Sequence, residues 1–553
     1  MASGNLAFVL HAHLPFVRHP EHARHLEERW LYEAIIECYL PLIDVFDRLA
    51  KEEVPFAVTM SLTPPLAWML KDELLRARFE DHLTRLEHLS EREMKRLWGD
   101  AHFAPLATFY REELARIRDV WERHDGDVVA ALVKHWDAGR VELLTCSATH
   151  CYLPGMLPAR EGIRPQLEVG VRAFEHLTGR RPLGMWLPEC AYTPEIDADV
   201  AAAGVRFTVL DTHGITRARP RPPFGVHAPI VSPSGVAFFG RDQESSRQVW
   251  SREEGYPGDV YYRDFYRDIG YDLPAADLLG EVQHDGGRLM TGLKYFRITG
   301  QKTDLAHKAP YIPGVAKERV WVHAGDFVRN RMAQVQWLEH SLGIHPIVVS
   351  PYDAELFGHW WYEGPMFLEA VFRRMQEQSD VRAVTLRQHL DENPIVVRAT
   401  PAASTWGDGG YGRVWVGAEA AWTWRHVHHA TRYVHWLVER HRSADGRRGK
   451  ALDQCVRELL LLQSSDWNFI LKTGTSTQYA EARVRAHVRR LRHLGYIVEH
   501  GEQPAPTPDP KTPVEQVEQT LDDAAWLDSV CARDNFLSTL SSEELRRVWD
   551  APS

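Results

Sequence analysis

Two carboxylates in this chain follow directly after short apolar runs, a position typical of catalytic side chains. Glu189 lies in the segment MWLPECAY, and Asp353 lies in the segment SPYDAELFGHWWYEGP. Glu189 comes too early to cap the helix expected from Pro194, so capping does not explain it. Two carboxyl groups on opposite sides of a sugar-sized groove can cleave a glycosidic bond. One attacks or stabilises the anomeric carbon, and the other protonates the leaving oxygen.

A pair of histidines, His11 and His13 in HAHLPF, forms a second candidate group. The two histidines are two residues apart, so both side chains point to the same face if this segment is a strand. Such a pair can bind zinc in a deacetylase or related hydrolase, with Asp211 or His213 as a third ligand. The same imidazoles can instead bind sugar hydroxyls, or serve structure alone. The spacing leaves these readings open, and a metal-dependent hydrolase is kept as an alternative.

The elements that must position these residues are short apolar runs separated by amphipathic helical stretches. Strands separated by helices are typical of βαβ units and a parallel sheet. Seven or eight such units close into a barrel, whose active face lies at the carboxyl ends of the strands. Polar residues gather after most of these runs, which favours an enzyme. The predicted strands are residues 6–10, 56–60, 141–145, 183–187, 205–210, 236–239 and 347–349.

The rest of the chain departs from this alternation in two places. Residues 76–137 are charged and helical with no obvious strand, which predicts a helical insertion in the barrel. From residue 401 onward three helix-like stretches predict an all-helical C-terminal domain, and prolines between 504 and 513 indicate an extended strap. Two further helices are expected near 514–537 and 542–549. The barrel is therefore assigned residues 1–75 and 138–400, with an insertion at 76–137 and a C-terminal domain at 401–553.

Composition excludes several classes of protein. The 553 residues are 44% hydrophobic and 25% charged, which does not fit a disordered or fibrous chain. A formal net charge of −11 argues against nucleic acid or an anionic membrane as partner. The apolar runs are shorter than the roughly 18 residues of a membrane helix, and the N-terminus resembles a first strand rather than a secretory signal. Six cysteines without a CxxC pair predict reduced thiols and a cytoplasmic location.

Five segments, taken together and in order, resemble family 57 glycoside hydrolases, and within that family the 1,4-α-glucan branching enzymes. They are HAHLPF (11–16), GRVELLTCSATH (139–150), MWLPECAY (185–192), SPYDAELFGHWWYEGP (350–365) and AWTWRHVHHATRYVHW (421–436). The resemblance implies an α/β fold: a distorted, TIM-like (β/α)7 barrel with a helical insertion and an all-helical C-terminal domain. It also implies that no metal or other cofactor is needed.

The resemblance assigns roles to particular residues. Glu189 corresponds to the nucleophile and Asp353 to the general acid/base, and in a retaining enzyme their carboxyl groups lie about 5–5.5 Å apart. The resemblance places further residues at the substrate: His11, His13 and His150 in the donor subsite, Trp406 and Trp415 as aromatic contacts, and Asp466 from the C-terminal side. Trp360, beyond Asp353, is a candidate wall of the same site. Nineteen tryptophans in the chain fit either sugar platforms or a large core.

The implied reaction is a retaining double displacement on α-1,4-glucan, such as amylose or a glycogen-like chain, which is both donor and acceptor. Transfer to a 6-hydroxyl would create an α-1,6 branch. Two segments are expected to cover the intermediate: residues 231–250 and the glycine-rich, mobile loop 405–417. The family's branching enzymes often carry a Tyr in the first segment, where this chain has Phe238 and Phe239 instead. An α-amylase-type hydrolase or a 4-α-glucanotransferase is therefore the alternative.

Overall fold

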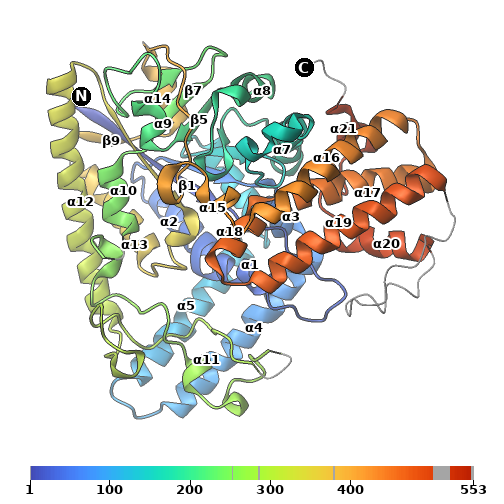
Figure 1. Ribbon diagram of the computed structural model, residues 1–553. Helices are drawn as coiled ribbons and strands as arrows, with labels where there is room; N and C mark the ends of the chain where they lie inside the picture. Colours follow the sequence, from blue (N-terminus) through green and yellow to red (C-terminus); the bar gives the residue numbers. More distant parts are fainter. Residues whose placement is uncertain are drawn as a thin grey trace.

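The computed structural model describes residues 2–251, 253–283, 287–377, 380–395, 397–501 and 523–549 (Figure 1). At its centre, the described residues form a ring of seven parallel strands, one for each predicted apolar run. These are β1 (Gly4–Ala12), β2 (Val58–Leu62), β3 (Val141–Cys146), β4 (Met185–Trp186), β5 (Phe207–Leu210), β7 (Ala237–Gly240) and β8 (Ile347–Asp353). The predicted strands are confirmed, with boundaries that differ by up to three or four residues.

The ring closes through two weak seams. Five strands pair in the order β4-β3-β2-β1-β8, all parallel, and β5 pairs with β7. A single bridge between Gly184 and Phe207 joins β4 to β5, and the amide of Asp242 donates to the carbonyl of Val349 at 2.8 Å to join β7 to β8. The predicted (β/α)7 barrel is thereby confirmed. The short strands β6 (Ile230–Val231) and β9 (Val381–Ala383), which flank β7 and β1, were not predicted.

Alternation along the strands determines what reaches the catalytic end of the ring. On β1, Ala7 and Val9 pack inside the ring, whereas Leu6, Phe8 and Leu10 pack outward against the helices. Because side chains alternate with a period of two, the next inward positions on β1 belong to His11 and then His13. Likewise Ile347 and Val349 point inward on β8, and the same parity brings Asp353 inward at the strand end.

Helices cover the outside of the ring. They are α2 (Leu40–Lys51), α3 (Pro64–Lys71), α6 (Val128–Asp137), α7 (Ile163–Thr178), α8 (Asp197–Ala202), α10 (Gln243–Trp250), α12 (Pro313–Leu342), α13 (Gly364–Gln376) and α14 (Leu386–Glu392). Shorter helices are α1 (Glu28–Ala34), the π-helix η1 (Ile35–Tyr39), α9 (Thr212–Thr216), α11 (Ile269–Asp272) and α15 (Arg413–Val416). The described residues include no helix long and apolar enough to cross a membrane.

The insertion is narrower than predicted. It consists of α4 (Glu73–Arg96) and α5 (Ala104–Arg123), an antiparallel pair at the bottom of Figure 1. The segment 128–137, which was assigned to the insertion, forms α6, and α6 packs on β3 and α7 of the barrel. Its apolar face, with Val129 and Leu132, is needed to cover β3, and this makes it a barrel helix.

The C-terminal region is helical, as predicted. It consists of α16 (Ala421–Arg440), α17 (Gly446–Leu462), α18 (Ser465–Thr473), α19 (Thr477–His500), α20 (Asp523–Arg533) and α21 (Ser542–Arg547). The expected proline strap at 504–513, and the start of the helix expected at 514–537, lie outside the described residues. In Figure 1 these helices form a separate layer beside the barrel, with α18 nearest to it.

A buried ion cluster holds α19 to the segment after α20. The carboxylate of Asp534 accepts a hydrogen bond from Arg483 at 2.9 Å and another from Arg490. Burial opposes ionisation of Asp534, but both arginines and His487 lower its pKa well below the usual value. We expect Asp534→Asn to destabilise the protein by about 3–5 kcal/mol in urea unfolding at neutral pH, because two buried guanidinium groups lose their counter-ion.

The pH dependence of this effect follows from the lowered pKa. The contribution of Asp534 is fully present above the unfolded-state pKa of about 4 and is lost as pH falls through the folded value. The difference in the free energy of unfolding between the wild type and Asp534→Asn should therefore become smaller at acidic pH. Asp528→Asn is the control, since Asp528 pairs with Lys450 on the surface of the same region and no measurable change is expected. Equal effects of the two substitutions would contradict the prediction.

Candidate active site

The C-terminal ends of the strands gather most of the predicted catalytic residues. β1 supplies His11 and leads into His13, the turn after β3 supplies His150, and the turn after β4 supplies Glu189. β8 ends at Asp353. The first turn of α18 adds Asp466 from the C-terminal region, whose side chain is 14% exposed. Segments from five parts of the sequence thus meet at one end of the barrel.

Glu189 is held by donors from two remote segments. Its side chain accepts a hydrogen bond from Trp406 Nε1 at 3.0 Å and from Ser465 Oγ at 2.8 Å. The Trp406 amide also donates to the Glu189 carbonyl at 3.0 Å. Glu189 and Cys190 both have left-handed backbone angles, with φ of 65° and 47°. Such strain costs about 1–3 kcal/mol per residue and is typical of functional positions.

Burial and hydrogen bonding act in opposite directions on the pKa of Glu189. Burial raises the pKa of Glu189 to about 7, although the donors Trp406 and Ser465 favour the charged form and pull against burial. The nearby carboxylate of Asp466 adds to the rise. Near neutral pH, therefore, Glu189 is poised to lose its proton, and the charged form is the one that a nucleophilic carboxylate needs.

The environment of Asp353 also favours its neutral form. Burial, Glu355 and Glu189 together raise the pKa of Asp353 well above its usual value, and Arg241 opposes them. Glu355 is held in place because it accepts hydrogen bonds from the His13 amide at 3.2 Å and from the Tyr39 hydroxyl. A raised pKa favours the protonated form of Asp353, which is the form a general acid needs.

Four side chains form a hydrogen-bonded relay that ends at Glu189. Ser61 Oγ lies 2.6 Å from His11 Nδ1, His11 Nε2 lies 3.0 Å from His150 Nε2, and His150 Nδ1 lies 2.8 Å from Ser465 Oγ. Because Ser465 donates to the Glu189 carboxylate, its oxygen accepts from His150 Nδ1–H. His150 Nε2 then accepts from His11 Nε2–H, and Ser61 donates to His11 Nδ1.

Both relay histidines are neutral in this arrangement. Burial is the largest cause that lowers the pKa of His11 and of His150 well below the ordinary value, and charge repulsion among His11, His13 and His150 adds to it. Neutral imidazoles with defined tautomers hold Ser465 in one orientation. The relay therefore supports the Glu189 carboxylate through neutral side chains rather than through charged ones.

The zinc alternative can be tested on geometry. His13, His150 and Asp466 place ligand atoms within 4.8 Å of one another, so Asp466 stands where Asp211 or His213 was expected. The rings of His13 and His150, however, are stacked with centroids 3.8 Å apart and planes 15° from parallel. A metal ion binds in the plane of each imidazole, and two stacked, nearly parallel rings cannot direct lone pairs at one ion. His13 instead pairs with the Asp466 carboxylate at 3.0 Å.

The tryptophans predicted at the substrate lie in different layers. Trp406 contacts Glu189 directly. Trp415 is only 1% exposed and stacks on Tyr152, with ring centroids 5.4 Å apart, so it supports the Trp406 segment from behind. Trp360 is 46% exposed and meets Trp250 edge-on at 5.9 Å, away from the hydrogen bonds around Glu189. Of these three tryptophans, Trp406 is the one that donates a hydrogen bond to Glu189.

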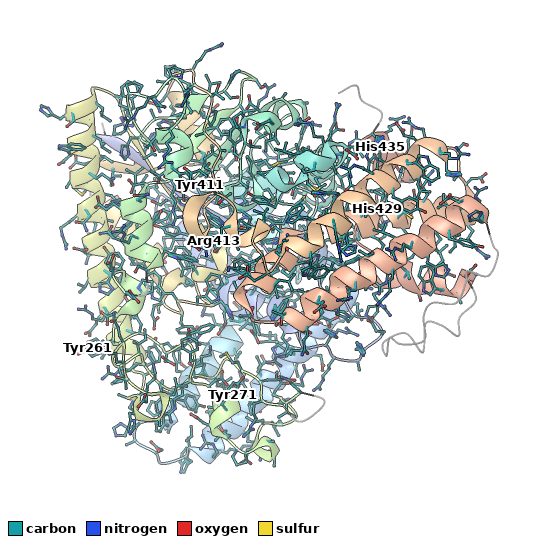
Figure 2. The ribbon with its side chains drawn as sticks, viewed as in Figure 1. Tyr261, Tyr271, Tyr411, Arg413, His429 and His435 are labelled. Carbon is teal, nitrogen blue, oxygen red and sulfur yellow. The ribbon has the colours of Figure 1, made fainter. Side chains whose placement is uncertain are left out.

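The glycine-rich segment 405–417, expected to be mobile, is tied down. His213 Nε2 donates to the Gly410 carbonyl at 2.7 Å, and the amide of Gly412 donates to Thr405 Oγ1 at 3.0 Å. A Cβ at Gly412, where φ is 81°, would lie 2.1 Å from the Tyr152 hydroxyl. Glycine is thus required for close packing. Figure 2 shows Tyr411 and Arg413 of this segment where the barrel meets the C-terminal helices.

The segment 231–250, expected to be a covering loop, is regular structure. It forms the end of β6, then β7 and α10, and both Phe238 and Phe239 are fully buried. The turn between β6 and β7 precedes the start of a barrel strand, so it lies at the end of the ring opposite Glu189. Neither phenylalanine can take the place of a mobile tyrosine over the site.

Sequence reasoning missed several residues that shape the site. Ser465 was hidden beside Asp466 in SSDW, and Ser61 and Thr63 alternate at the end of β2, as His11 and His13 do on β1. Trp186 stacks on His11, with ring centroids 4.6 Å apart. For Ser61, Thr63 and Trp186 the usable signal was a polar or aromatic residue at an inward position at the end of a strand, whereas Ser465 comes from a helix and had no such signal.

Ser465 offers a test of how Glu189 is tuned. Ser465→Ala removes one donor to the carboxylate, and donors favour the charged form, so the pKa of Glu189 should rise above about 7. The acid limb of kcat/KM should move to higher pH. At neutral pH we expect a loss of about 10- to 100-fold, from a charged hydrogen bond worth about 1.5–3 kcal/mol. Thr473→Ala, exposed at the other end of α18, is the control. A slower enzyme with an unmoved acid limb would contradict this assignment.

The barrel, the two carboxylates and their helical partner define an enzyme that acts on glycosidic bonds. Residues 7–320 match the sequence model of glycosyl hydrolase family 57, and residues 426–543 match that of the C-terminal region of 1,4-alpha-glucan branching enzymes. The chain belongs to glycosyl hydrolase family 57.

Several named proteins are similar to this chain over most of its length. A 1,4-alpha-glucan branching enzyme of Thermococcus kodakarensis is 32% identical over 89% of this chain and 73% of its own length. The structure of the alpha-amylase AmyC of Thermotoga maritima has a TM-score of 0.89 and 37% identity, covering 98% of this chain and 99% of the other. A family 57 branching enzyme of Pyrococcus horikoshii has a TM-score of 0.84 and 30% identity, with 98% and 97% covered.

Proposed function

We propose that this protein is a 1,4-α-glucan branching enzyme that cuts an α-1,4 bond and transfers the released chain to a 6-hydroxyl, forming α-1,6 branches. The observation that carries the proposal is the meeting of Glu189 and Asp353 with a C-terminal region of the branching-enzyme type. That region is part of the site, because Ser465 donates to Glu189 and Asp466 pairs with His13. Amylose-like or glycogen-like chains would be donor and acceptor.

In the first step, a Glu189 oxygen attacks C1 of an α-1,4-linked glucose. Asp353 gives its proton to the departing 4-oxygen, so the bond from C1 to that oxygen breaks as the bond to Glu189 forms. The buried, neutral Asp353 is suited to donate, and the Glu189 carboxylate is suited to attack. The product is a covalent glucosyl-enzyme with inverted configuration at C1.

In the second step, the ionised Asp353 takes the proton of an acceptor 6-hydroxyl. The 6-oxygen attacks C1 and releases Glu189, which restores both carboxyl groups and the original α configuration. Trp406 and Ser465 favour the departing carboxylate, since each donates to one of its charged oxygens. The ring nitrogens of His11, His13 and His150 are already taken by Ser61, Thr63, Ser465, Asp466 and each other, so these residues would position Glu189 and Asp466 beside the donor sugar. Trp406 would offer that sugar an aromatic face.

An α-amylase-type hydrolase is the second candidate. One observation favours it: the 37% identity to the Thermotoga maritima structure named as an alpha-amylase. Water instead of a sugar hydroxyl would then release the glucosyl-enzyme. Six unpaired cysteines, five of them buried, support the further proposal that the protein works in the reducing cytoplasm.

Amylose incubated with purified protein separates these candidates. New α-1,6 anomeric protons would be followed by NMR beside new reducing ends, with Glu189→Gln as the inactive reference. A growing α-1,6 signal with few reducing ends supports branching. Reducing ends without that signal would make the protein a hydrolase with the same site, and no change in either would overturn the α-glucan assignment.

A further inference from the structure

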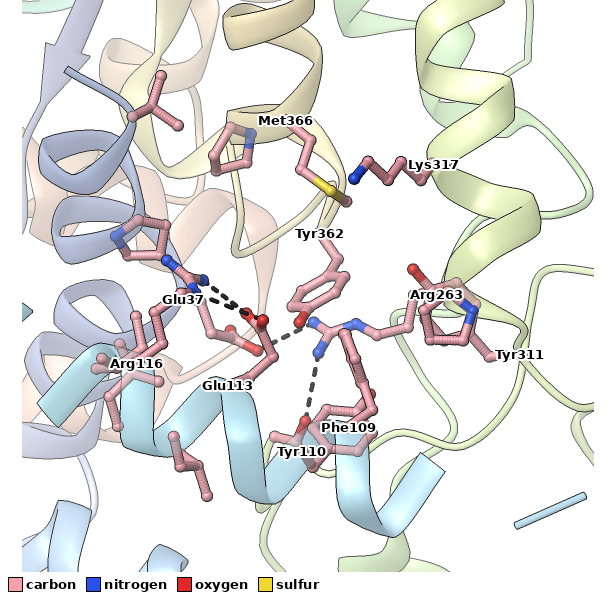
Figure 3. Close-up of a pocket in the computed structure, with 18 of the residues that line it drawn as sticks. Glu37, Phe109, Tyr110, Glu113, Arg116, Arg263, Tyr311, Lys317, Tyr362 and Met366 are labelled. Carbon is pink, nitrogen blue, oxygen red and sulfur yellow. Dashed lines mark hydrogen bonds and ion pairs between the residues drawn. The ribbon is translucent and has the colours of Figure 1, made fainter. Parts of the chain in front are cut away.

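A second cavity lies outside the ring of strands, between the insertion and the helices that flank β8. It has a volume of about 630 Å³, within the range of about 300–1,000 Å³ usual for ligand pockets. Figure 3 shows α5 on one side and residues of α12 and α13 on the other. No residue around Glu189 described above lines it, so the cavity is separate from the catalytic site.

Three aromatic rings form one wall of this cavity. Phe109 of α5 meets Tyr362 edge-on, with centroids 6.3 Å apart and planes at 79°, and Tyr311 meets Tyr362 at 6.4 Å and 83°. Behind them the Arg263 guanidinium lies 4.0 Å from the centre of the Tyr362 ring. Flat faces set at right angles are suited to a ligand with apolar faces and polar edges, as a pyranose ring has.

The charges around the cavity balance one another. Arg263, only 6% exposed, pairs with Glu37 at 3.0 Å, and Arg116 pairs with Glu113 at 2.6 Å. The Arg116–Glu113 pair is partly exposed at the cavity, whereas the Arg263–Glu37 pair lies behind the aromatic wall and is nearly buried (Figure 3). Paired carboxylates and guanidinium groups offer acceptors and donors side by side with little net charge. Such a wall recognises neutral hydroxyl groups better than it recognises an ionised ligand.

The π-helix η1 separates the two sites. Its Cys38 thiol donates to the Ala354 carbonyl at 3.0 Å, and its Tyr39 hydroxyl donates to Glu355, both directly after Asp353. Its Ile36 and Glu37 face the cavity. A π-helix is rare and is frequent at functional sites. Here it forms the shared wall between the acid/base segment and the cavity.

We propose that this cavity is a second, non-catalytic binding site for α-glucan, which takes a short segment of chain against the partly exposed rings of Phe109 and Tyr362, with the buried Tyr311 behind them. The proposal rests on the proposed function, since it assumes that α-glucan is the substrate. A polymer-transferring enzyme gains from a second hold on its substrate, because binding at one site raises the effective concentration of the chain at the other.

Calorimetry with maltotriose tests this proposal, using Glu189→Gln so that the sugar is not consumed. We expect two binding sites per chain. Phe109→Ala in the same background should leave one, because it removes a wall of the cavity. Thr108→Ala, the exposed neighbour on α5, should leave two. If Phe109→Ala fails to fold, Met366→Trp blocks the cavity by filling it instead and should give the same result.

Each outcome decides the proposal. One site in the Glu189→Gln protein, or two sites that survive both cavity substitutions, would overturn it. An apolar dye that binds the cavity and is not displaced by maltotriose would also overturn it, in favour of an apolar ligand. The α-1,6 assay on wild-type protein is separate. Two binding sites without branch formation would support the second glucan site and reject the branching activity. One binding site with branch formation would support the branching activity and reject the second glucan site.

Discussion

Glu189→Gln should abolish both transfer and hydrolysis, with kcat lowered by about 10⁴- to 10⁶-fold, the range seen when a nucleophile or its partner is removed from an enzyme. The substitution keeps the size of the side chain but removes the charge that attacks C1. Trp406 and Ser465 both donate to this carboxylate, so one of them must face an amide N–H in the variant. The change in structure is therefore confined to the hydrogen bonds of this side chain, whereas the loss of activity is nearly complete.

Initial rates on amylose, measured with NMR and a reducing-end assay, check this prediction. Glu195→Gln is the control, since Glu195 is an exposed glutamate six residues further along the same segment. Maltotriose should still bind the Glu189→Gln protein, which would show that the fold and the sugar site survive. Activity within about tenfold of the wild type would remove Glu189 from the nucleophile's role.

The pH profile gives a second reading of the same residue. Because the pKa of Glu189 is raised to about 7 by burial, kcat/KM of the wild type should rise with pH as this group loses its proton. Asp353 must keep its proton over the same interval, and burial together with Glu355 and Glu189 raises its pKa. The two groups predict a bell-shaped profile. An acid limb near pH 4 would contradict the raised pKa of Glu189.

Asp353→Asn should have the second-largest effect, a loss of about 10²- to 10⁴-fold on amylose, the usual contribution of a general acid. Its signature is dependence on the leaving group. A maltooligosaccharide with a 2,4-dinitrophenyl leaving group needs no protonation, so its first step should be almost as fast as in the wild type. The glucosyl-enzyme should then accumulate, because Asp353 is no longer present to activate the acceptor.

Azide completes this test. It attacks C1 without a general base and should release the α-glucosyl azide from Asp353→Asn, while wild-type protein gives little of it. Asp391→Asn, exposed on α14, is the control and should behave as wild type. Equal losses on amylose and on the dinitrophenyl substrate, with no azide product, would place Asp353 in a structural role instead.

Strand positions and inward-facing residues could be predicted from the sequence, because both depend on the pattern of neighbouring residues. Buried strands read as apolar runs whatever packs against them, and inward positions alternate by two, so the seven strands of the ring and the catalytic placement of His11 and Asp353 followed from the chain. The boundary of the helical insertion could not be predicted in this way. Helix α6 has the amphipathic pattern of α4 and α5, and only its packing on β3 shows that it belongs to the barrel.

Composition also did not reveal how the glycine-rich segment 405–417 packs. Glycines at 407–412 predicted a flexible loop, yet His213 and Thr405 hold this segment and Tyr152 leaves no room for a Cβ at Gly412. The same glycines that allow freedom in an isolated peptide allow close packing in the folded chain. Similarly, residues 231–250 carry turn signals around the pair Phe238–Phe239, but the fold buries both rings and sends the turn to the far end of the barrel.

By itself, then, the sequence determined the barrel and the family and indicated the two candidate carboxylates, because each depends on residue type at a short and regular spacing. Only the tertiary structure decided that Ser465, 276 residues from Glu189, donates to the nucleophile, and that stacked His13 and His150 leave no common plane for a metal ion. It also decided that a separate cavity lies behind η1. These features depend on distances between remote segments, which no local pattern encodes.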